Sequence, residues 1–244
     1  MIMLKKQLNI IQGDCNKILP TLKEDSIDLV VTSPPYNVGL DYNFYDDKLP
    51  YDEYLSFLYD VWKNCYRVLK WDGRICINMS PVRRLQRFII SDVAKQLEDI
   101  GYRFRDHIIW NKQNITKRSA WGSWMSPSCP WLLQPYEFII IYNKRFPKKR
   151  GSKSDITRDE FIEYTNSLWS FSGETKVPEH PAVFPEELPK RLIKLYSYVD
   201  DTVLDPFLGS GTTLKVAKDL DRRGIGIELD PKYVELAKER CKVE

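Results

Sequence analysis

The chain has 244 residues, 43% of them apolar, which is enough to bury the core of one domain, residues 1–244, that carries an insertion. No apolar run approaches the roughly 20 residues that cross a bilayer, and the N-terminus has no secretory apolar segment, so we expect a cytoplasmic protein with no membrane partner. Five cysteines at unrelated spacings and two histidines predict neither a disulfide framework nor a metal site. The net charge of +3 does not by itself indicate a nucleic-acid binder.

The first half of the chain alternates predicted strands with predicted helices. We expect strands at 8–11, 27–31, 73–79 and 102–110, and helices at 51–69 and 85–100. The helix at 51–69 repeats apolar residues at helical spacing, so its aromatic side chains are expected in the core rather than at a substrate. Strands that alternate with helices predict an α/β sheet.

The apolar strand at 27–31 ends in Thr32-Ser-Pro-Pro-Tyr-Asn37. Two consecutive prolines, Pro34 and Pro35, hold the backbone extended and leave carbonyl groups without strand partners. If the Ser33 hydroxyl and the Pro34 carbonyl accepted the hydrogens of an exocyclic base amino group, its lone pair would become available for methyl transfer. Tyr36 offers a flat face for an extruded base. The alternative interpretation is a proline turn that merely ends a strand.

Residues 37–48 are polar and aromatic, and they could form a loop that closes over a substrate. The segment at 113–175 interrupts the alternation and is predicted to be an insertion. Exposed tryptophans beside basic residues bind bases and phosphates, so we expect DNA contacts from this insertion. The candidate contacts are Lys117, Arg118, Trp121 and Trp124. A hydrophobic plug that anchors the insertion is the alternative. A strand at 136–142, antiparallel to that at 102–110, should rejoin the sheet, whereas 155–179 shows no clear pattern.

Six of the ten residues from Lys144 to Lys153 are basic. A block of this kind attracts phosphates by releasing counterions. Lys148, Lys149 and Arg150 are therefore candidate DNA contacts, and a solvated loop is the alternative. Further along, Pro185 and Glu186 are suited to start a helix. We expect His180, just before that helix, to be structural, because methyl transfer to an amino group needs no dedicated histidine.

A strand, a glycine turn and a helix are predicted over 202–220. Val203 and Leu204 form the strand, and either Thr212 or Thr213 can cap the helix. This layout brings backbone close to a cofactor. A carboxylate at the strand tip, Asp205, would repel a pyrophosphate but attract an ammonium, so the favoured ligand is S-adenosylmethionine rather than a nicotinamide dinucleotide. The candidate contacts are Asp205, Pro206, Phe207, Gly209, Ser210, Gly211 and Thr212.

The next predicted strand ends on Glu228, 23 residues after Asp205, where a carboxylate accepts both hydroxyls of a ribose. Too little chain follows Glu228 to complete a parallel sheet, so the remaining strands must come from earlier in the sequence. The fold is therefore predicted to be circularly permuted. In that arrangement Asp14 lies beside the adenine and accepts from its amino group, unless it only caps the following helix.

The two motifs, Asp205-Pro-Phe-Leu-Gly-Ser-Gly-Thr-Thr213 and Thr32-Ser-Pro-Pro-Tyr36, in this order along the chain, resemble those of the β-class DNA amino-methyltransferases of restriction-modification systems. The resemblance implies a Rossmann-like methyltransferase fold with a mixed seven-stranded sheet. It also implies a target-recognition region near 113–175, the same adenine contact for Asp14, and Phe184 beside the methionine end of the cofactor. The implied partners are double-stranded DNA and a cognate restriction endonuclease, with the enzyme a monomer or a homodimer.

The target base is open at this point. In the family, Ser before Pro-Pro is commoner in enzymes that methylate N4 of cytosine, and Asp in those that methylate N6 of adenine, so we favour cytosine and keep adenine as the alternative. RNA and protein-amide methyltransferases usually begin the tetrapeptide with Asn and carry the cofactor loop first. The motif order of this chain therefore argues against both classes. Two residues disfavour a nicotinamide oxidoreductase: Asp205, which would repel a pyrophosphate, and Leu214, which stands where the dinucleotide fingerprint has its third small residue. The two intact motifs disfavour a non-catalytic DNA-binding module.

Overall fold

The computed structural model describes residues 8–39, 41–42, 45–81, 87–113, 122–173 and 184–243. Its strands are β1 (Leu8–Gln12), β2 (Ile27–Thr32), β3 (Asp41–Tyr42), β4 (Tyr45–Asp46), β5 (Leu69–Met79), β6 (Arg103–Asn111), β7 (Tyr136–Asn143), β8 (Leu168–Ser170), β9 (Thr202–Asp205) and β10 (Arg223–Glu228). Its helices are α1 (Cys15–Ile18), η1 (Leu19–Thr21), α2 (Tyr51–Val68), α3 (Ile89–Ile100), α4 (Arg158–Tyr164), α5 (Glu187–Tyr196), α6 (Thr212–Asp219) and α7 (Pro231–Cys241).

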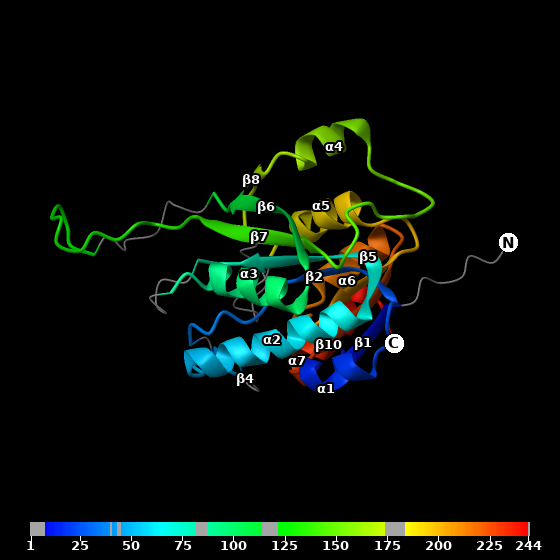
Figure 1. Ribbon diagram of the computed structural model, residues 1–244, viewed down its shortest axis with the longest axis horizontal. Coiled ribbons are helices and arrows are strands. Elements are labelled where there is room, and N and C mark those ends of the chain that lie inside the picture. Colours follow the sequence, from blue (N-terminus) through cyan, green and yellow to red (C-terminus); the bar gives the residue numbers. More distant parts are fainter. Residues whose placement is uncertain are drawn as a thin grey trace.

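The main sheet has the order β1-β10-β9-β2-β5-β7-β6-β8 (Figure 1). The predicted permutation is confirmed, because the first strand, β1, pairs in parallel with β10 near the end of the chain. The predicted mixed character is confirmed as well, since β7 runs antiparallel to both β5 and β6. The sheet has eight strands where seven were expected. The additional strand is β8, which pairs in parallel with the end of β6.

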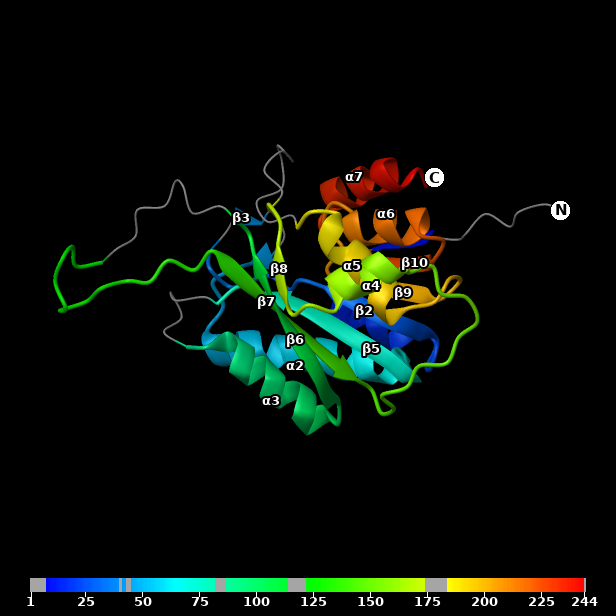
Figure 2. The ribbon, with the colours of Figure 1, turned by 90° about the horizontal axis from the view of Figure 1, so that it is seen from above.

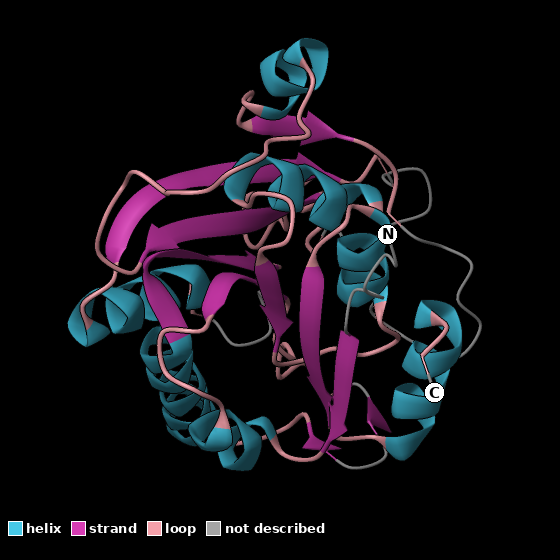
Figure 3. Cartoon of the chain, turned by 90° about the vertical axis from the view of Figure 1, so that its right-hand side faces the viewer, coloured by secondary structure: helices cyan, strands magenta, loops and turns pink. Residues whose placement is uncertain are grey.

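Helices cover both faces of this twisted sheet (Figures 2 and 3). All six residues of β2 are buried, as befits a strand near the middle of a covered parallel sheet. Val30 belongs to the core formed with α2 and α3, whereas its neighbours Leu29 and Val31 pack in the core formed with α5 and α6. This alternation fixes which way β2 faces, and with it the direction in which the chain leaves the strand at Ser33.

Most predicted helices occur close to their expected positions. The aromatic residues Tyr54 and Trp62 of α2 are fully buried, which confirms their placement in the core. Helix α3 begins at Ile89, later than the expected Leu85, and residues 82–86 lie outside the described part of the chain. No helix in the described ranges is long and apolar enough to span a membrane.

The segment at 155–179, which shows no clear pattern in the sequence, contains α4 and the edge strand β8. Helix α4 starts with a capping box, in which Thr157 accepts from the Glu160 backbone and Glu160 accepts from the Thr157 backbone. The Thr-x-x-Glu spacing was the available sequence signal for this helix. The side chain of Trp169 in β8 is buried beside Phe171, whose ring stacks on Trp110 of β6. These contacts attach the segment to the sheet.

The basic run lies at the edge of the sheet where β2 begins, and for Lys149 burial contradicts the predicted DNA contact. The Lys149 side chain is 3% exposed, with Nζ 2.8 Å from Asp28 and 3.3 Å from Asp201. Lys144 is buried too, and Nζ contacts Asp25 at 2.9 Å. These partners lie where β2 begins, because β7 runs antiparallel and delivers the run to that edge of the sheet. The eight residues of β7 place the run about 20 Å or more from the edge where β2 ends.

Lys148 and Arg150 are exposed, but they lie on the same remote edge. The Arg150 backbone N–H accordingly donates to Asp72, which lies near the start of β5. Strand β5 runs parallel to β2, so its start marks the same edge of the sheet. The basic run therefore contains two kinds of residue: buried lysines that form ion pairs, and exposed basic residues such as Lys148 and Arg150. Sequence composition could not separate them, because the partners Asp25, Asp28 and Asp201 are distant in the chain.

We predict that Lys149→Met lowers the free energy of unfolding by about 3 kcal/mol, because it removes the cation that faces the buried Asp28 carboxylate. Lys70 also contacts Asp28 at 2.9 Å, and the two lysines hold the pKa of that carboxyl below its ordinary value although burial alone would raise it. Lys148→Met, on the exposed neighbour, is the matched control and should change stability by no more than about 0.5 kcal/mol. Urea denaturation measures both, and equal effects would contradict the assignment.

Candidate active site

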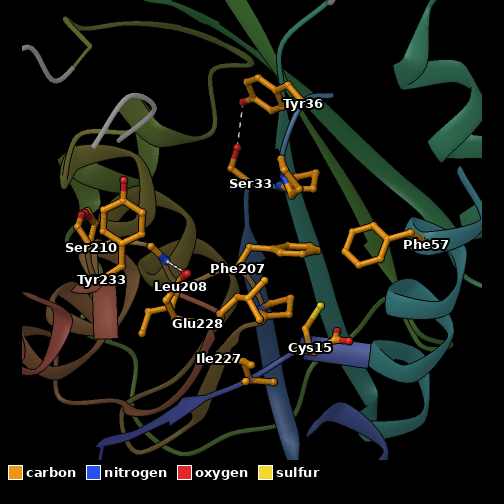
Figure 4. Close-up of a pocket in the computed structure, with 18 of the residues that line it drawn as sticks. Cys15, Ser33, Tyr36, Phe57, Phe207, Leu208, Ser210, Ile227, Glu228 and Tyr233 are labelled. Atoms are coloured by element: carbon orange, nitrogen blue, oxygen red, sulfur yellow. Dashed lines mark hydrogen bonds between the residues drawn. The ribbon is translucent and has the colours of Figure 1, made fainter. Parts of the chain in front are cut away.

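A cavity of about 500 Å³ opens where β2, β9 and β10 end at their carboxyl edges (Figure 4). Parallel α/β sheets place ligands at this edge. Twelve of the residues predicted to act in catalysis or cofactor binding line it: Asp14, Ser33, Pro34, Pro35, Tyr36, Phe184, Pro206, Phe207, Gly209, Ser210, Thr212 and Glu228. The two motifs, which are distant in sequence, therefore form one site.

The tetrapeptide supplies one wall of the cavity. The Ser33 hydroxyl lies 2.9 Å from the Tyr36 hydroxyl. The Pro35 carbonyl accepts a 2.6 Å hydrogen bond from Tyr54 of α2, which holds the end of the proline turn. No residue in the described ranges donates to the carbonyl of Pro34, so that acceptor remains available beside Ser33. Ser33 and Pro34 thus both line the wall, and their roles as acceptors for a substrate stay a prediction.

Tyr36 is held from behind by polar side chains of β5 and β7. Its hydroxyl lies 3.3 Å from both the Asn78 amide nitrogen and Glu137 Oε2. Asn78 donates to Glu137 at 2.6 Å, and Lys112 Nζ lies 2.7 Å from the other Glu137 oxygen. Burial and the charge of Glu137 raise the pKa of Tyr36 far above its usual value, so its hydroxyl keeps its proton.

Asp205 ends β9, at the predicted strand tip, but its side chain is enclosed by protein groups. Its side chain is 1% exposed and does not line the cavity. Oδ1 accepts from the Thr32 hydroxyl at 2.7 Å and the Phe207 backbone at 3.1 Å, and Oδ2 accepts from the Thr213 hydroxyl at 2.6 Å. These donors reach both oxygens, and the contact with a ligand ammonium stays a prediction. Asp205 instead ties the turn of β9 to β2 and α6.

The glycine turn has two kinds of glycine. Gly209 adopts a φ of +54°, and its N–H donates to Glu228 Oε2 at 2.7 Å, at the cavity. Gly211 adopts a φ of +86° and caps α6, but it does not line the cavity, contrary to the prediction. A Cβ on Gly211 would lie 2.9 Å from Ala237, so this glycine serves the packing of α7. The cap is not made by Thr212 or Thr213.

Glu228 lies at the tip of β10, facing the cavity as predicted. Backbone N–H groups of Gly209 and Asp230 donate to its two oxygens, at 2.7 and 2.9 Å. Burial raises the pKa of Glu228, and these two hydrogen bonds oppose the shift. Asp14 both lines the cavity and caps α1 by accepting from Asn16 at 2.9 Å, so the two interpretations of this residue are compatible.

The sequence missed several cavity residues: Gly13, Cys15, Lys17, Phe57, Leu208, Ile227, Leu229 and Tyr233. Phe57 lies on α2 outside the apolar positions that repeat at helical spacing. An aromatic residue off the core-facing side of the helix was the sequence signal that could have indicated a site contact. The Phe57 ring lies 6.0 Å from that of Phe207. Lys117, Arg118, Trp121 and His180 lie outside the described residues.

The described part of the predicted closing loop is anchored to the protein. The buried Asp47 carboxylate accepts from the backbone N–H groups of Asn37, Val38 and Gly39 at 2.8 to 3.0 Å. The Asn37 side chain in turn donates to the Leu49 carbonyl. These bonds fix the direction of the chain directly after Tyr36, so they stabilise the tetrapeptide.

Residues 122–135, called the arm from here on, leave the body between β6 and β7 (Figures 1 and 2). Its tip is closed by the Gly122–Pro130 bridge and by hydrogen bonds between Ser123 and Cys129. Trp124 on this tip is 67% exposed. Because Phe138, near the start of β7, pairs with Met79 at the end of β5, the arm leaves from the same edge of the sheet as the cavity.

Comparison with known proteins identifies the family. A DNA methylase family model, for adenine-N6 and cytosine-N4 methyltransferases, matches residues 27–239. The chain belongs to this DNA methylase family. It is 37% identical over 243 residues to the type II methyltransferase M.HpaI of Haemophilus parainfluenzae, covering 96% of this chain and 74% of that protein. It is 46% identical over 159 residues to M.MjaVI of Methanocaldococcus jannaschii, covering 64% and 81%.

A solved structure is similar over nearly the whole chain. The putative DNA modification methylase TTHA0409 of Thermus thermophilus, complexed with S-adenosyl-L-methionine, has a TM-score of 0.76 at 30% identity and covers 96% of this chain and 93% of its own. The methylase described here is thus an S-adenosyl-L-methionine-dependent DNA amino-methyltransferase. The cavity fits that cofactor, since it combines an anchored carboxylate, Glu228, with apolar walls that include Phe207, Ile227 and Leu229.

The burial of Asp205 predicts a pH-dependent stability. Burial raises the pKa of its carboxyl to about 6, from 3.8, against the opposing hydrogen bonds of Thr213 and Thr32. A raised pKa means that the folded protein binds the proton more tightly, so this contribution to stability is present at low pH and is lost as the pH rises through 6. Asp205→Asn removes the titration.

Relative to Asp205→Asn, the wild type should therefore lose about 2 kcal/mol of stability between pH 4.5 and pH 7. Urea denaturation of both proteins at each pH measures the difference, in which the other titrating groups cancel. A stability difference that is constant with pH would show that Asp205 titrates at its ordinary value.

Proposed function

We propose that this methylase transfers the methyl group of S-adenosyl-L-methionine to the N4 amino group of cytosine, extruded from double-stranded DNA. The observation that carries the proposal is the position of Ser33, a neutral acceptor at the cavity wall with the Pro34 carbonyl beside it. N6 of adenine, methylated by the same chemistry, is the alternative. Serine before Pro-Pro favours cytosine, as in the family that the sequence resembles.

In this proposal the chain's own groups align the reaction. The cofactor supplies an electrophilic methyl group. Ser33 and Pro34 accept the hydrogens of the amino group, which localises the nitrogen lone pair and disperses the positive charge that develops on attack. Tyr36 stacks on the base, and no covalent enzyme intermediate is required. Glu228 binds the ribose hydroxyls, Asp14 the adenine amino group, and Phe184 packs near the methionine end.

The DNA is proposed to lie along the edge of the sheet that carries the cavity and the arm. Trp124, Trp121, Lys117 and Arg118 are its proposed contacts in the predicted target-recognition insertion at 113–175. Strand β7, which falls within that range, pairs on both sides and belongs to the sheet, so the recognition role is assigned to the segments that flank it. A cognate restriction endonuclease, suggested by the type II names of M.HpaI and M.MjaVI, and a cytoplasmic location complete the proposal.

The target base is tested by product analysis. The protein is incubated with unmethylated genomic DNA and tritiated S-adenosylmethionine, the DNA is digested to nucleosides, and the labelled nucleoside is identified by mass. We predict 4-methylcytosine, and loss of most turnover in Ser33→Ala with unchanged cofactor binding. Label in 6-methyladenine would favour the alternative, and absence of label from DNA would contradict the proposal.

The DNA path is tested by binding. Trp124→Ala should weaken binding to duplex DNA at least about fivefold, the lower range for loss of a stacking contact, without changing cofactor affinity. The matched control replaces both Lys148 and Arg150 by Ala on the remote edge and should change DNA affinity less than about twofold. Fluorescence anisotropy measures both, and a larger effect from the control pair would place the DNA on the other edge.

A further inference from the structure

The described site contains a buried ion pair to which the proposed chemistry assigns no role. Glu137, near the start of β7, and Lys112, just after β6, lie 2.7 Å apart with side chains 10% and 14% exposed. Withdrawing both charges from water is costly, and replacing such a pair by apolar side chains is often neutral or stabilising. Stability alone therefore does not explain an ion pair at this position beside the tetrapeptide.

The direction of the hydrogen bonds can be worked out from their donors. Lys112 donates to Glu137 Oε1, and the Asn78 amide donates to Oε2 at 2.6 Å. Tyr36 has a single hydroxyl proton and two oxygen neighbours, Glu137 Oε2 at 3.3 Å and Ser33 Oγ at 2.9 Å. If the proton pointed to Ser33, the phenol oxygen would face a carboxylate oxygen with no hydrogen between them. The anion therefore orients the Tyr36 proton toward itself.

The orientation of Tyr36 determines that of Ser33. With its own proton directed to Glu137, the Tyr36 oxygen can only accept, so the Ser33 hydroxyl donates to it across 2.9 Å. The lone pairs of Ser33 are then left for the cavity that this residue lines. A serine hydroxyl can otherwise donate or accept, and donation into the amino nitrogen would engage the lone pair that must attack the methyl group.

We propose that Glu137 is a positioning residue that directs the chain Ser33→Tyr36→Glu137, so that Ser33 is presented to the target amino group as an acceptor. Lys112 holds the carboxylate in place, and Asn78 completes its hydrogen bonds. An aspartate in place of Ser33 would need no such device, because an ionised carboxylate can only accept. This inference rests on the proposed amino-group chemistry and assigns to three further residues, from β5, β7 and the end of β6, a role in it.

Glu137→Gln tests the direction while keeping the shape. Lys112 attracts the amide oxygen of the new glutamine, so its amide nitrogen faces Tyr36 and Asn78. The Asn78 amide, whose oxygen has no partner, turns to accept from that nitrogen, and no carboxylate then holds the Tyr36 proton. The Tyr36 proton then turns to Ser33, and the Ser33 proton turns into the cavity. We expect the rate of label transfer to DNA to fall at least about tenfold, as for the loss of a hydrogen bond to a charged group. The dissociation constant for S-adenosylmethionine should hardly change. The melting temperature should fall, because Lys112 loses its anion, so turnover is compared at a temperature at which both proteins are folded.

A double-mutant cycle separates positioning from general support. In single turnovers with enzyme in excess, Glu137→Gln should cause less than about a twofold further loss in the Ser33→Ala background, since the group through which it acts is gone. Losses that multiply across the two sites, or full turnover in Glu137→Gln, would overturn the proposal. Wild-type protein that transfers no label to DNA would instead overturn the proposed function itself.

Tyr36→Phe covers the case in which Glu137→Gln fails to fold. It removes only the hydroxyl that links Ser33 to Glu137, and leaves the ion pair intact. The same loss of turnover is expected, again with no further loss in the Ser33→Ala background. A Tyr36→Phe protein with wild-type turnover would show that no hydrogen-bond chain through this hydroxyl orients Ser33.

Discussion

A buried hydrogen bond of 2.7 Å, from the Thr32 hydroxyl to Asp205 Oδ1, joins two motifs that lie 173 residues apart. It can form because β9 pairs in parallel with β2, in a register that places Leu204 beside Val30. The same pairing brings the tetrapeptide and the glycine turn to one edge of the sheet. The two motifs meet although the catalytic one comes first in the sequence. The permuted chain allows this because β1, from its start, pairs with β10, from near its end.

Three acidic side chains near the cavity differ in their hydrogen-bond partners and in whether they face the cavity. Asp205 is fully buried and takes hydrogen bonds from two hydroxyls and a backbone N–H, so it orders the turn. Glu228 is fixed by two backbone donors and still faces the cavity, where it can accept from a ligand. Glu137 is paired with Lys112 and acts on the tetrapeptide through Tyr36. A carboxylate is thus a structural anchor at Asp205, the proposed ligand of the ribose at Glu228, and the proposed positioning group at Glu137.

The sequence predicted the features that depend on local pattern. Alternating apolar runs located the strands, and the Asp205 and Ser33 motifs located the cavity. The prediction for Lys149 was wrong because it depended on distant partners, Asp28 and Asp201, which bury and neutralise this lysine. The hydrogen bond from Thr32 to Asp205 also joins residues that are distant in sequence, and no local pattern predicts it. The ion pair of Glu137 and Lys112 was not predicted either. The sequence predicted the antiparallel pairing of these two strands but not its register, which places Trp110 beside Glu137 and so brings Lys112 close to it.

Cofactor and target base are proposed to meet in the cavity at the carboxyl ends of β2, β9 and β10. The most direct test is a crystal structure with S-adenosylhomocysteine and a duplex containing the site at which the enzyme modifies genomic DNA. We expect an extruded base whose amino group contacts Ser33 Oγ and the Pro34 carbonyl at hydrogen-bonding distance, with the nitrogen facing the cofactor sulfur. A base that stays stacked in the duplex, or binds away from Ser33, would contradict it.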